Sequence, residues 1–401
     1  MGKFQTFLVY YKKAALILLN ICVFVILLNV CFWGIYSVKD KFFKKAPIEQ
    51  KYGIALFKKV YPDLSEKTIH ELLLETWFIP QVYESFTQFK EIPIQGKYIN
   101  IDENGFRFSK DQAPWPPDPN RFTIFLFGGS TAFGYGVRDH ETVASYLQDI
   151  LASRLKTGIS IYNFGRGYYY STQERIFFER LLSSGFIPNM AIFLDGVNDF
   201  FNHTNKPACT DRLERYMKKP RVQQMVLNKM PMTRAIRDFK RMLRNYTLSS
   251  GHKSQRKQVF DEQRYNDQKI IRRVVNTYVE NKKIIEAVAS VYGVRTIFVW
   301  QPISIYNYDL KYHLFLGGAF RAQGYSKYGY TFMSDFIKEN SLGDNFLWCA
   351  DIQKDLKESL YVDGVHYSAK MSKILANTIV DLLFKRNLLK LHIDQAVGQQ
   401  L

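Results

Sequence analysis

Residues 14–38 contain no charged side chain. A helix of about 20 apolar residues covers the roughly 30 Å hydrocarbon core of a bilayer, so this stretch is long enough to cross one. It runs directly into the basic segment KDKFFKK and lacks the small-residue cleavage site that ends a signal peptide. The sequence therefore predicts a retained transmembrane helix at 14–38, preceded by an N-terminal tail of residues 1–13.

Lysines flank this helix on both sides, so the positive-inside rule does not choose its orientation. Three precede the helix and four follow it: Lys3, Lys12 and Lys13, then Lys39, Lys41, Lys44 and Lys45. The orientation therefore has to follow from what the soluble part does.

The chain carries a net charge of +18. About two thirds of this charge lies in residues 206–257, a segment that contains fifteen Lys or Arg and only three Asp or Glu. One interpretation is that this segment forms helices that are exposed to solvent and lie outside the regular alternation of strands and helices. Another is a basic surface that binds an anionic polymer or touches anionic lipid headgroups. Nucleic acid is not expected as a partner, because no recognition helix or aromatic-basic motif accompanies the charge.

The cysteines predict no metal site. Cys22 and Cys31 fall in the predicted membrane helix, which leaves Cys209 and Cys349 in the soluble part, with no CxxC pair. The last two form either one disulfide or two free thiols. We expect neither a metal nor a cofactor.

Short apolar runs alternate with amphipathic stretches from residue 121 onward. The runs typical of buried strands are 121–127, 160–164, 190–195 and 294–300, and helical spacing occurs at 143–151, 268–291 and 371–382. Such alternation predicts an α/β fold with a parallel sheet covered by helices on both faces. The active site of such a sheet lies beyond the carboxyl ends of its strands.

The predicted domains follow from changes in this pattern. Residues 46–120 form a membrane-proximal extension that contains a hairpin at GKYINIDENGFRFS and ends in the proline-rich KDQAPWPPDPN. Residues 121–390 form the α/β domain, which a basic helical insertion at 202–267 interrupts.

The stretch FLFGGSTAFGYGV (125–137) ends the first predicted strand in a glycine-rich turn. It is not a P-loop, which requires GxxxxGK[ST], and it has only two of the three glycines of a dinucleotide fingerprint. The GxSxG elbow of α/β-hydrolases fails as well, because Ala132 occupies the position of its second glycine. Ser130 is therefore either a helix cap or a nucleophile in another geometry.

Residues that would support a nucleophile follow in order along the chain. Asn198 lies in DGVNDF, at the carboxyl tip of the third predicted strand. Asp363 precedes His366 by three residues in YVDGVHYS, a spacing that lets the carboxylate accept the Nδ1 proton and direct Nε2 toward a serine. The glycine block YNFGRGYYYSTQE (162–174) offers main-chain N–H groups for an oxyanion.

Together these four blocks resemble those of the SGNH, or GDSL-type, hydrolases, and in particular membrane-anchored bacterial members. The resemblance covers residues 121–385. It implies a flavodoxin-like three-layer α/β/α sandwich, with Ser130 as nucleophile and His366 as a base oriented by Asp363. The implied oxyanion donors are the N–H of Ser130, an N–H from Gly167 or Tyr168, and the side chain of Asn198.

The chain departs from the family pattern in three places. The family's Gly-Asp-Ser is Gly128-Gly129-Ser130 here, and the family's oxyanion glycine aligns with Tyr168. The separation between Ser130 and His366 exceeds that of a minimal member, and the basic insertion accounts for the excess.

We therefore expect a membrane-anchored serine esterase that acts on short acyl esters, foremost O-acetyl groups, of a cell-envelope polysaccharide or glycolipid. This function places the catalytic domain on the periplasmic face of the inner membrane. The alternatives are an O-acyltransferase or a lipase with the same triad, and a non-catalytic partner in polysaccharide modification.

Overall fold

The computed structural model describes residues 2–42, 44–155, 158–218, 230–250, 262–315 and 323–389. Parts of the predicted basic insertion and the predicted end of the α/β domain at residue 390 lie outside these residues. The chain divides into two compact units, one made of Met1–Lys45 with Asp211–Val259 and the other of Ala46–Thr210 with Phe260–Leu401.

The first unit contains two long helices, α1 (Gly2–Phe42) and α11 (Pro231–Ser250). Within α1, Phe4–Asp40 is apolar and exposed along its length, and it is long enough to cross a membrane. The predicted apolar helix at 14–38 is therefore present as one continuous exposed helix, as expected for a segment that has no soluble core to join.

The second unit is built on a five-stranded parallel sheet in the order β6-β5-β7-β8-β9. This is the flavodoxin-like order, in which the chain reverses direction across the sheet next to the first strand. The strands are β5 (Phe122–Gly128), β6 (Ile159–Asn163), β7 (Met190–Asp195), β8 (Arg295–Trp300) and β9 (Phe346–Trp348). The sequence predicted the first four of these strands and their parallel arrangement, which the structure confirms.

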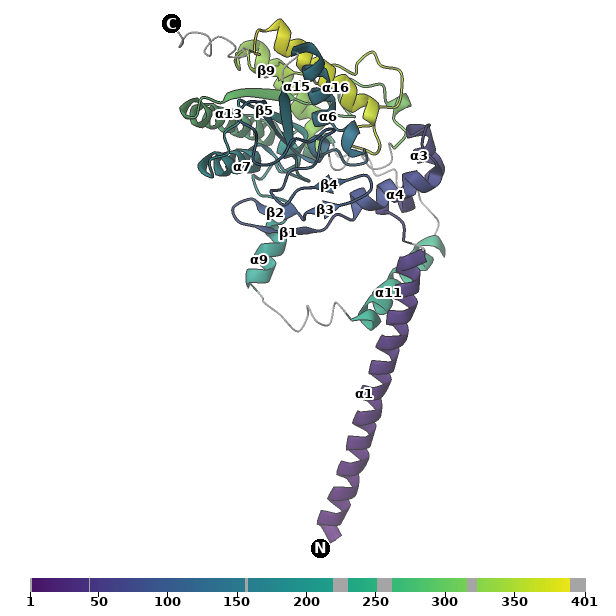
Figure 1. Ribbon diagram of the computed structural model, residues 1–401. Helices are drawn as coiled ribbons and strands as arrows, with labels where there is room; N and C mark the ends of the chain where they lie inside the picture. The colour runs from purple at the N-terminus through teal and green to yellow at the C-terminus, as the bar shows by residue number, and fades with distance from the viewer. Residues whose placement is uncertain are drawn as a thin grey trace. The chain divides into compact units, whose positions relative to one another are not determined.

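The two faces of the sheet differ in chemistry because successive strand residues point to opposite sides. Aliphatic residues such as Ile124 and Leu126 pack against α6 (Val143–Leu155) and α16 (Ala369–Lys385). The other face is aromatic and packs against α7 (Ser171–Ser183), α13 (Gln268–Val291) and α15 (Gly324–Glu339) (Figure 1). The structure thus has the three layers that the alternation predicted.

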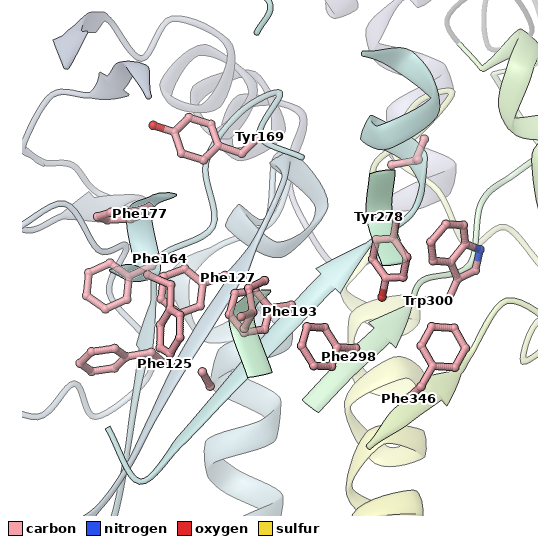
Figure 2. Close-up of a cluster of buried hydrophobic side chains, with 14 of the residues drawn as sticks. Phe125, Phe127, Phe164, Tyr169, Phe177, Phe193, Tyr278, Phe298, Trp300 and Phe346 are labelled. Carbon is pink, nitrogen blue, oxygen red and sulfur yellow. The ribbon is translucent and has the colours of Figure 1, made fainter. Parts of the chain in front are cut away.

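Phenylalanines of adjacent strands form a continuous layer on the aromatic face. The ring of Phe127 stacks on Phe193 with centroids 5.0 Å apart, and Phe193 stacks on Phe298 at 5.3 Å. Figure 2 shows these rings side by side across the sheet, with Trp300 and Phe346 continuing the row. Burial of such large rings makes this layer a main source of stability.

The extension contributes short elements and a core of its own. Its elements are α2 (Pro47–Tyr52), α3 (Ile54–Val60), α4 (Glu66–Trp77), β1 (Gln81–Glu84), β2 (Gln88–Glu91), β3 (Ile94–Gln95) and β4 (Asn100–Ile101). Phe57 and Leu73 share a buried cluster with Phe133 and Val362, which neighbour Ser130 and Asp363 in the sequence. The extension is thereby packed against the carboxyl edge of the sheet.

The remaining described elements are short. They are α5 (Ser130–Phe133), α8 (Val197–Phe201), α9 (Thr210–Lys218), α12 (Glu262–Tyr265) and 3-10 turns at Asp139–Glu141 and Leu310–Tyr312. Cys209 and Cys349 are both free thiols, which is one of the two states that the sequence left open.

Candidate active site

Ser130 is the first residue of α5, which starts one residue after the end of β5, the first strand of the sheet along the chain. The turn between them is tight, since a side chain on Gly128 would place its Cβ 2.5 Å from Cβ of Ala132, and Gly128 has a positive φ of 154°. Glycine is the residue that tolerates both constraints. The turn therefore holds the serine hydroxyl at the carboxyl edge of the sheet.

Asp363 and His366 lie in a short loop that leads into α16. The N–H groups of Val365 and His366 both donate to Asp363 Oδ1 at 2.7 Å, and His366 Nδ1 lies 2.7 Å from Asp363 Oδ2. On the other side of the ring, His366 Nε2 lies 2.8 Å from Ser130 Oγ. The structure therefore brings the three predicted triad residues into one chain of hydrogen bonds.

The electrostatics of this chain favour an ionised carboxylate. Burial alone would raise the pKa of Asp363, but the facing imidazole and the two N–H donors outweigh it and hold the pKa below its usual value. An ionised Asp363 accepts a hydrogen bond from the Nδ1–H of His366, which leaves Nε2 as an acceptor for the hydroxyl of Ser130.

Two aromatic rings enclose the imidazole of His366. Tyr135 stacks on it with ring centroids 5.3 Å apart, and Trp77 meets it edge-on at 6.0 Å. Burial raises the pKa of the Tyr135 phenol, so this side chain stays neutral. The rings restrict the orientation of the imidazole without adding a charge beside it.

Asn198 lies in α8, which follows β7 at the same edge of the sheet. Its Nδ2 donates to the carbonyl of Tyr169 at 2.7 Å, and the amide has a second hydrogen available. A Cβ on Gly129 would lie only 2.1 Å from Nδ2 of Asn198. The amide is thus packed against the turn that carries Ser130, where an oxyanion donor is needed.

The structure disfavours one predicted oxyanion donor. The N–H of Gly167 already donates to Glu91 Oε1 at 2.9 Å, because β2 of the extension packs on the glycine block. Within the described part of the chain, no acceptor faces the N–H groups of Ser130 or Tyr168. Tyr168 has a φ of +65°, in the left-handed region that favours glycine.

A pocket of about 300 Å³ opens beside Ser130 and His366. Trp77, Ile79 and Gln81 of the extension form part of its wall. Sequence reasoning did not assign these residues to the site, since nothing in their local pattern indicates that the chain folds back there.

Two buried arginines fix the main chain around the site. Neither was predicted from the sequence as a site residue. Arg107 donates to the carbonyls of Phe133, Gly134 and Val137 at 2.6–2.9 Å and pairs with Asp139 at 2.9 Å. It therefore fixes the chain directly after α5. A charged residue inside the aromatic hairpin sequence GFRFS is the signal that could have revealed it.

Arg166 plays a similar part in the glycine block. It pairs with Glu84 of β1, donates to the hydroxyl of Tyr169 at 3.1 Å, and lies 3.9 Å above the ring of Phe177. Among the described residues, no group of three or more His, Cys, Asp or Glu is arranged to hold a metal ion.

The chain is similar in structure to lipases and esterases of the G-D-S-L type. Matches include the lipase Lip_vut3 from a goat rumen metagenome, at 11% identity and a TM-score of 0.38 over 65% of this chain and 97% of that one. A G-D-S-L family protein from Desulfitobacterium hafniense matches at 12% identity and 0.35, over 66% of this chain and 100% of its own.

The esterase EstA from a Pseudoalteromonas species matches at 14% identity and a TM-score of 0.33, over 67% of this chain and 100% of its own. No family model and no curated protein matches the sequence. Identities and TM-scores this low do not assign a function, whereas the geometry of the site limits the chemistry that it can perform.

Proposed function

We propose that this chain is a membrane-anchored serine esterase that cleaves short acyl esters, foremost O-acetyl groups, of a cell-envelope polysaccharide or glycolipid. The observation that carries the proposal is the hydrogen-bond chain from Ser130 Oγ through His366 to Asp363, with contacts of 2.8 and 2.7 Å, at the edge of a pocket. A structural serine does not require a base that is itself oriented by a buried carboxylate.

In the proposed reaction, Ser130 Oγ attacks the ester carbonyl carbon and its proton moves to His366 Nε2. The N–H groups of Ser130 and Tyr168 and the amide of Asn198 stabilise the oxyanion. The C–O bond to the alcohol then breaks as His366 returns the proton to the leaving oxygen. Water activated by His366 hydrolyses the acyl-serine and regenerates the enzyme.

The size and lining of the pocket support a small acyl group on a larger carrier. About 300 Å³ is at the lower end for ligand pockets. Tyr168 and Phe201 line the pocket with partly exposed rings, whose centroids are 6.1 Å apart. Both rings offer a flat apolar surface, and Tyr168 adds a hydroxyl at its edge, which suits the face of a sugar.

The retention of α1 as an anchor and the periplasmic position of the second unit belong to the same proposal. Anchoring is supported by the length and exposure of Phe4–Asp40. The positive charge of residues 206–257 would attract an anionic acceptor polymer or anionic headgroups alike.

The test is hydrolysis of 4-nitrophenyl acetate, butyrate and octanoate by the full chain in detergent micelles. We expect turnover that is fastest on the acetate and falls by at least about 10³-fold in Ser130→Ala. Preference for the octanoate would favour the lipase alternative. A folded wild-type protein without turnover on any ester, and without labelling of Ser130 by a fluorophosphonate, would favour the non-catalytic alternative.

The acyltransferase alternative differs only in the group that attacks the acyl-enzyme. Addition of a sugar acceptor would then increase the release of nitrophenol and produce an acylated sugar, which mass spectrometry detects. An acceptor that leaves the rate unchanged and gains no acyl group supports hydrolysis.

A further inference from the structure

Helix α11 packs beside the C-terminal part of α1 (Figure 1). The guanidinium of Arg234 makes two hydrogen bonds to Asp40, at 2.8 and 2.9 Å, and lies 3.9 Å above the ring of Tyr36. The contacts are polar and specific, so α11 is tied to one end of the apolar helix.

Aromatic residues on α1 indicate where a membrane surface would lie. Tyr10 and Tyr11 are exposed near one end of the helix, and Trp33 and Tyr36 lie near the other. Residues 14–33 span about 30 Å at 1.5 Å per residue, which matches the hydrocarbon core. Trp33 and Tyr36 therefore lie at the level of the headgroups, where aromatic belts occur.

The first turn of α11 begins just below this level, at the outer end of the 14–33 segment. The N–H of Met232 donates to Asn29 Oδ1 at 3.1 Å, and further along α11 the hydroxyl of Tyr36 donates to Asp238 Oδ2 at 3.0 Å. An apolar pocket lined by Trp33 and Pro231 lies beside this contact. These contacts hold the first turns of α11 at the boundary between the hydrocarbon core and the headgroups of a bilayer that α1 crosses.

The faces of α11 are sharply different. Ile236, Phe239 and Leu243 follow one another at helical spacing on one face, with 46%, 54% and 45% of their surface exposed, and Met242 at 59% flanks them. The opposite face is basic and carries Arg237 and Arg241, with Lys240 between the two faces. A basic helix with an exposed apolar stripe is the pattern of helices that lie in the membrane interface.

We propose that α11 lies in the plane of the membrane surface, with Ile236, Phe239 and Leu243 inserted among the acyl chains and Arg237, Lys240 and Arg241 at the phosphates of anionic lipids. The inference rests on the proposed retention of α1 as an anchor. The occupant of the exposed stripe is then lipid, because the contacts with α1 place the stripe at the depth where acyl chains begin.

The test uses spin labels on the full chain in vesicles of phosphatidylcholine, with and without phosphatidylglycerol. Cys22, Cys31, Cys209 and Cys349 are first replaced by alanine. A single cysteine is then introduced as Phe239→Cys or, as matched control two residues away on the basic face, as Arg237→Cys. Collisions with oxygen report acyl chains, and collisions with a water-soluble nickel chelate report solvent.

We expect the label at 239 to collide several-fold more often with oxygen than with the chelate, and the label at 237 to show the reverse. Combined substitution of Arg237, Lys240 and Arg241 by Gln, in the chain labelled at 239, should raise chelate collisions and abolish the effect of phosphatidylglycerol. Equal chelate access at 239 and 237 would overturn the proposal. Protection of 239 from both reagents would also overturn it, because the stripe would then be covered by protein.

Hydrolysis of 4-nitrophenyl acetate separates this inference from the proposed function, since α11 and the triad lie in different units. An inserted label in an inactive chain would count against the esterase alone. A mature chain whose N-terminal sequence begins after α1 would count against the anchor and hence against this inference, whatever the esterase activity.

Discussion

Single atoms decide whether the site can work. The amide of Asn198 reaches the Ser130 turn only because residue 129 has no side chain, and a Cβ there would lie 2.1 Å from its Nδ2. In the glycine block, the N–H of Gly167 donates to the carboxylate of Glu91, so the N–H of Tyr168 is the one that remains for an oxyanion in the proposed mechanism. Two neighbouring main-chain N–H groups thus differ in hydrogen bonding, and only that of Tyr168 is open for the proposed role of oxyanion donor.

Gly129→Ala should lower turnover of 4-nitrophenyl acetate by about 10²- to 10³-fold, as expected when one oxyanion donor is displaced. The effect should fall on kcat, while the fold is retained. Gly158→Ala is the matched control, since its nearest contact is 3.4 Å away. Unchanged turnover in Gly129→Ala would show that Asn198 is not needed for the reaction.

A second prediction concerns Asp199, the neighbour of Asn198 in the chain. Burial raises the pKa of Asp199 to about 6, although the hydroxyl of Ser171 donates to it at 2.6 Å. Burial also raises the pKa values of the adjacent carboxyls of Asp195 and Glu174. The native state therefore holds protons that the unfolded chain releases near pH 4.

Binding of these protons stabilises the native state. This stabilisation is complete below the pKa that the carboxyls have in the unfolded chain, and it is lost as the pH rises through their higher pKa in the folded protein. The free energy of unfolding should therefore decrease between about pH 4 and pH 8, with Asp199 and its two acidic neighbours contributing together. Urea unfolding of Asp199→Asn should show a weaker decline than the wild type, whereas Asp335→Asn, on the exposed face of α15, should not. A decline of equal size in both variants would contradict the assignment.

At the scale of elements, the site depends on the extension as much as on the sheet. Residues of α4 and β1 form the pocket wall, and β2 orients the glycine block. Arg107, next to the hairpin turn, binds the three carbonyls that follow α5. The extension therefore acts as a support for the nucleophile rather than as a spacer.

Arg107→Met should lower the free energy of unfolding by about 3–5 kcal/mol, because it leaves buried carbonyls and the carboxylate of Asp139 without their partner. Lys110→Ala, which removes an exposed pair with Asp149, should cost no more than about 1 kcal/mol. Denaturant unfolding measures both. Equal costs would mean that solvent replaces the buried contacts of Arg107.

The sequence predicted those elements whose signal is local. The pattern at 268–291 coincides with α13, and β5, β7 and β8 lie within one residue of their predicted bounds. The strand β9 escaped prediction because three residues, Phe346–Trp348, are too few to show a period. The short helices α2 and α3 of the extension were missed for a similar reason, whereas α4, with twelve residues, is long enough to show a helical period and was overlooked.

The site residues also divide into those that a local sequence pattern indicates and those that only the tertiary structure reveals. Asp363 and His366 are three residues apart, so their contact could be expected from spacing. The contact between Glu91 and Gly167 joins residues 76 positions apart, and the contact of Trp77 with His366 depends on how the extension folds back. Tertiary packing sets these distances, so the local sequence around each residue does not predict them.

At the scale of the whole molecule, the chain has one unit that we infer to be held at the membrane and one that carries the proposed catalytic site. The proposed substrates lie outside the cytoplasm, so the second unit should face the periplasm. The charges flanking α1 permit either orientation.

Ser184→Cys, on the exposed end of α7, should react with a membrane-impermeant maleimide once the outer membrane is permeabilised. Lys12→Cys, on the other side of α1, should react only after the inner membrane is opened. Both are made in the chain without its four native cysteines. The reverse labelling pattern would place the catalytic unit in the cytoplasm.

The order of the site residues along the chain has a consequence for synthesis. The wall residue Trp77 emerges from the ribosome first, Ser130 follows, and His366 comes 236 residues after the serine. A growing chain thus carries the proposed nucleophile long before the proposed base that would activate it. A fragment that stops anywhere in that interval has no activated serine, so the chain should not attack esters until its translation is nearly complete.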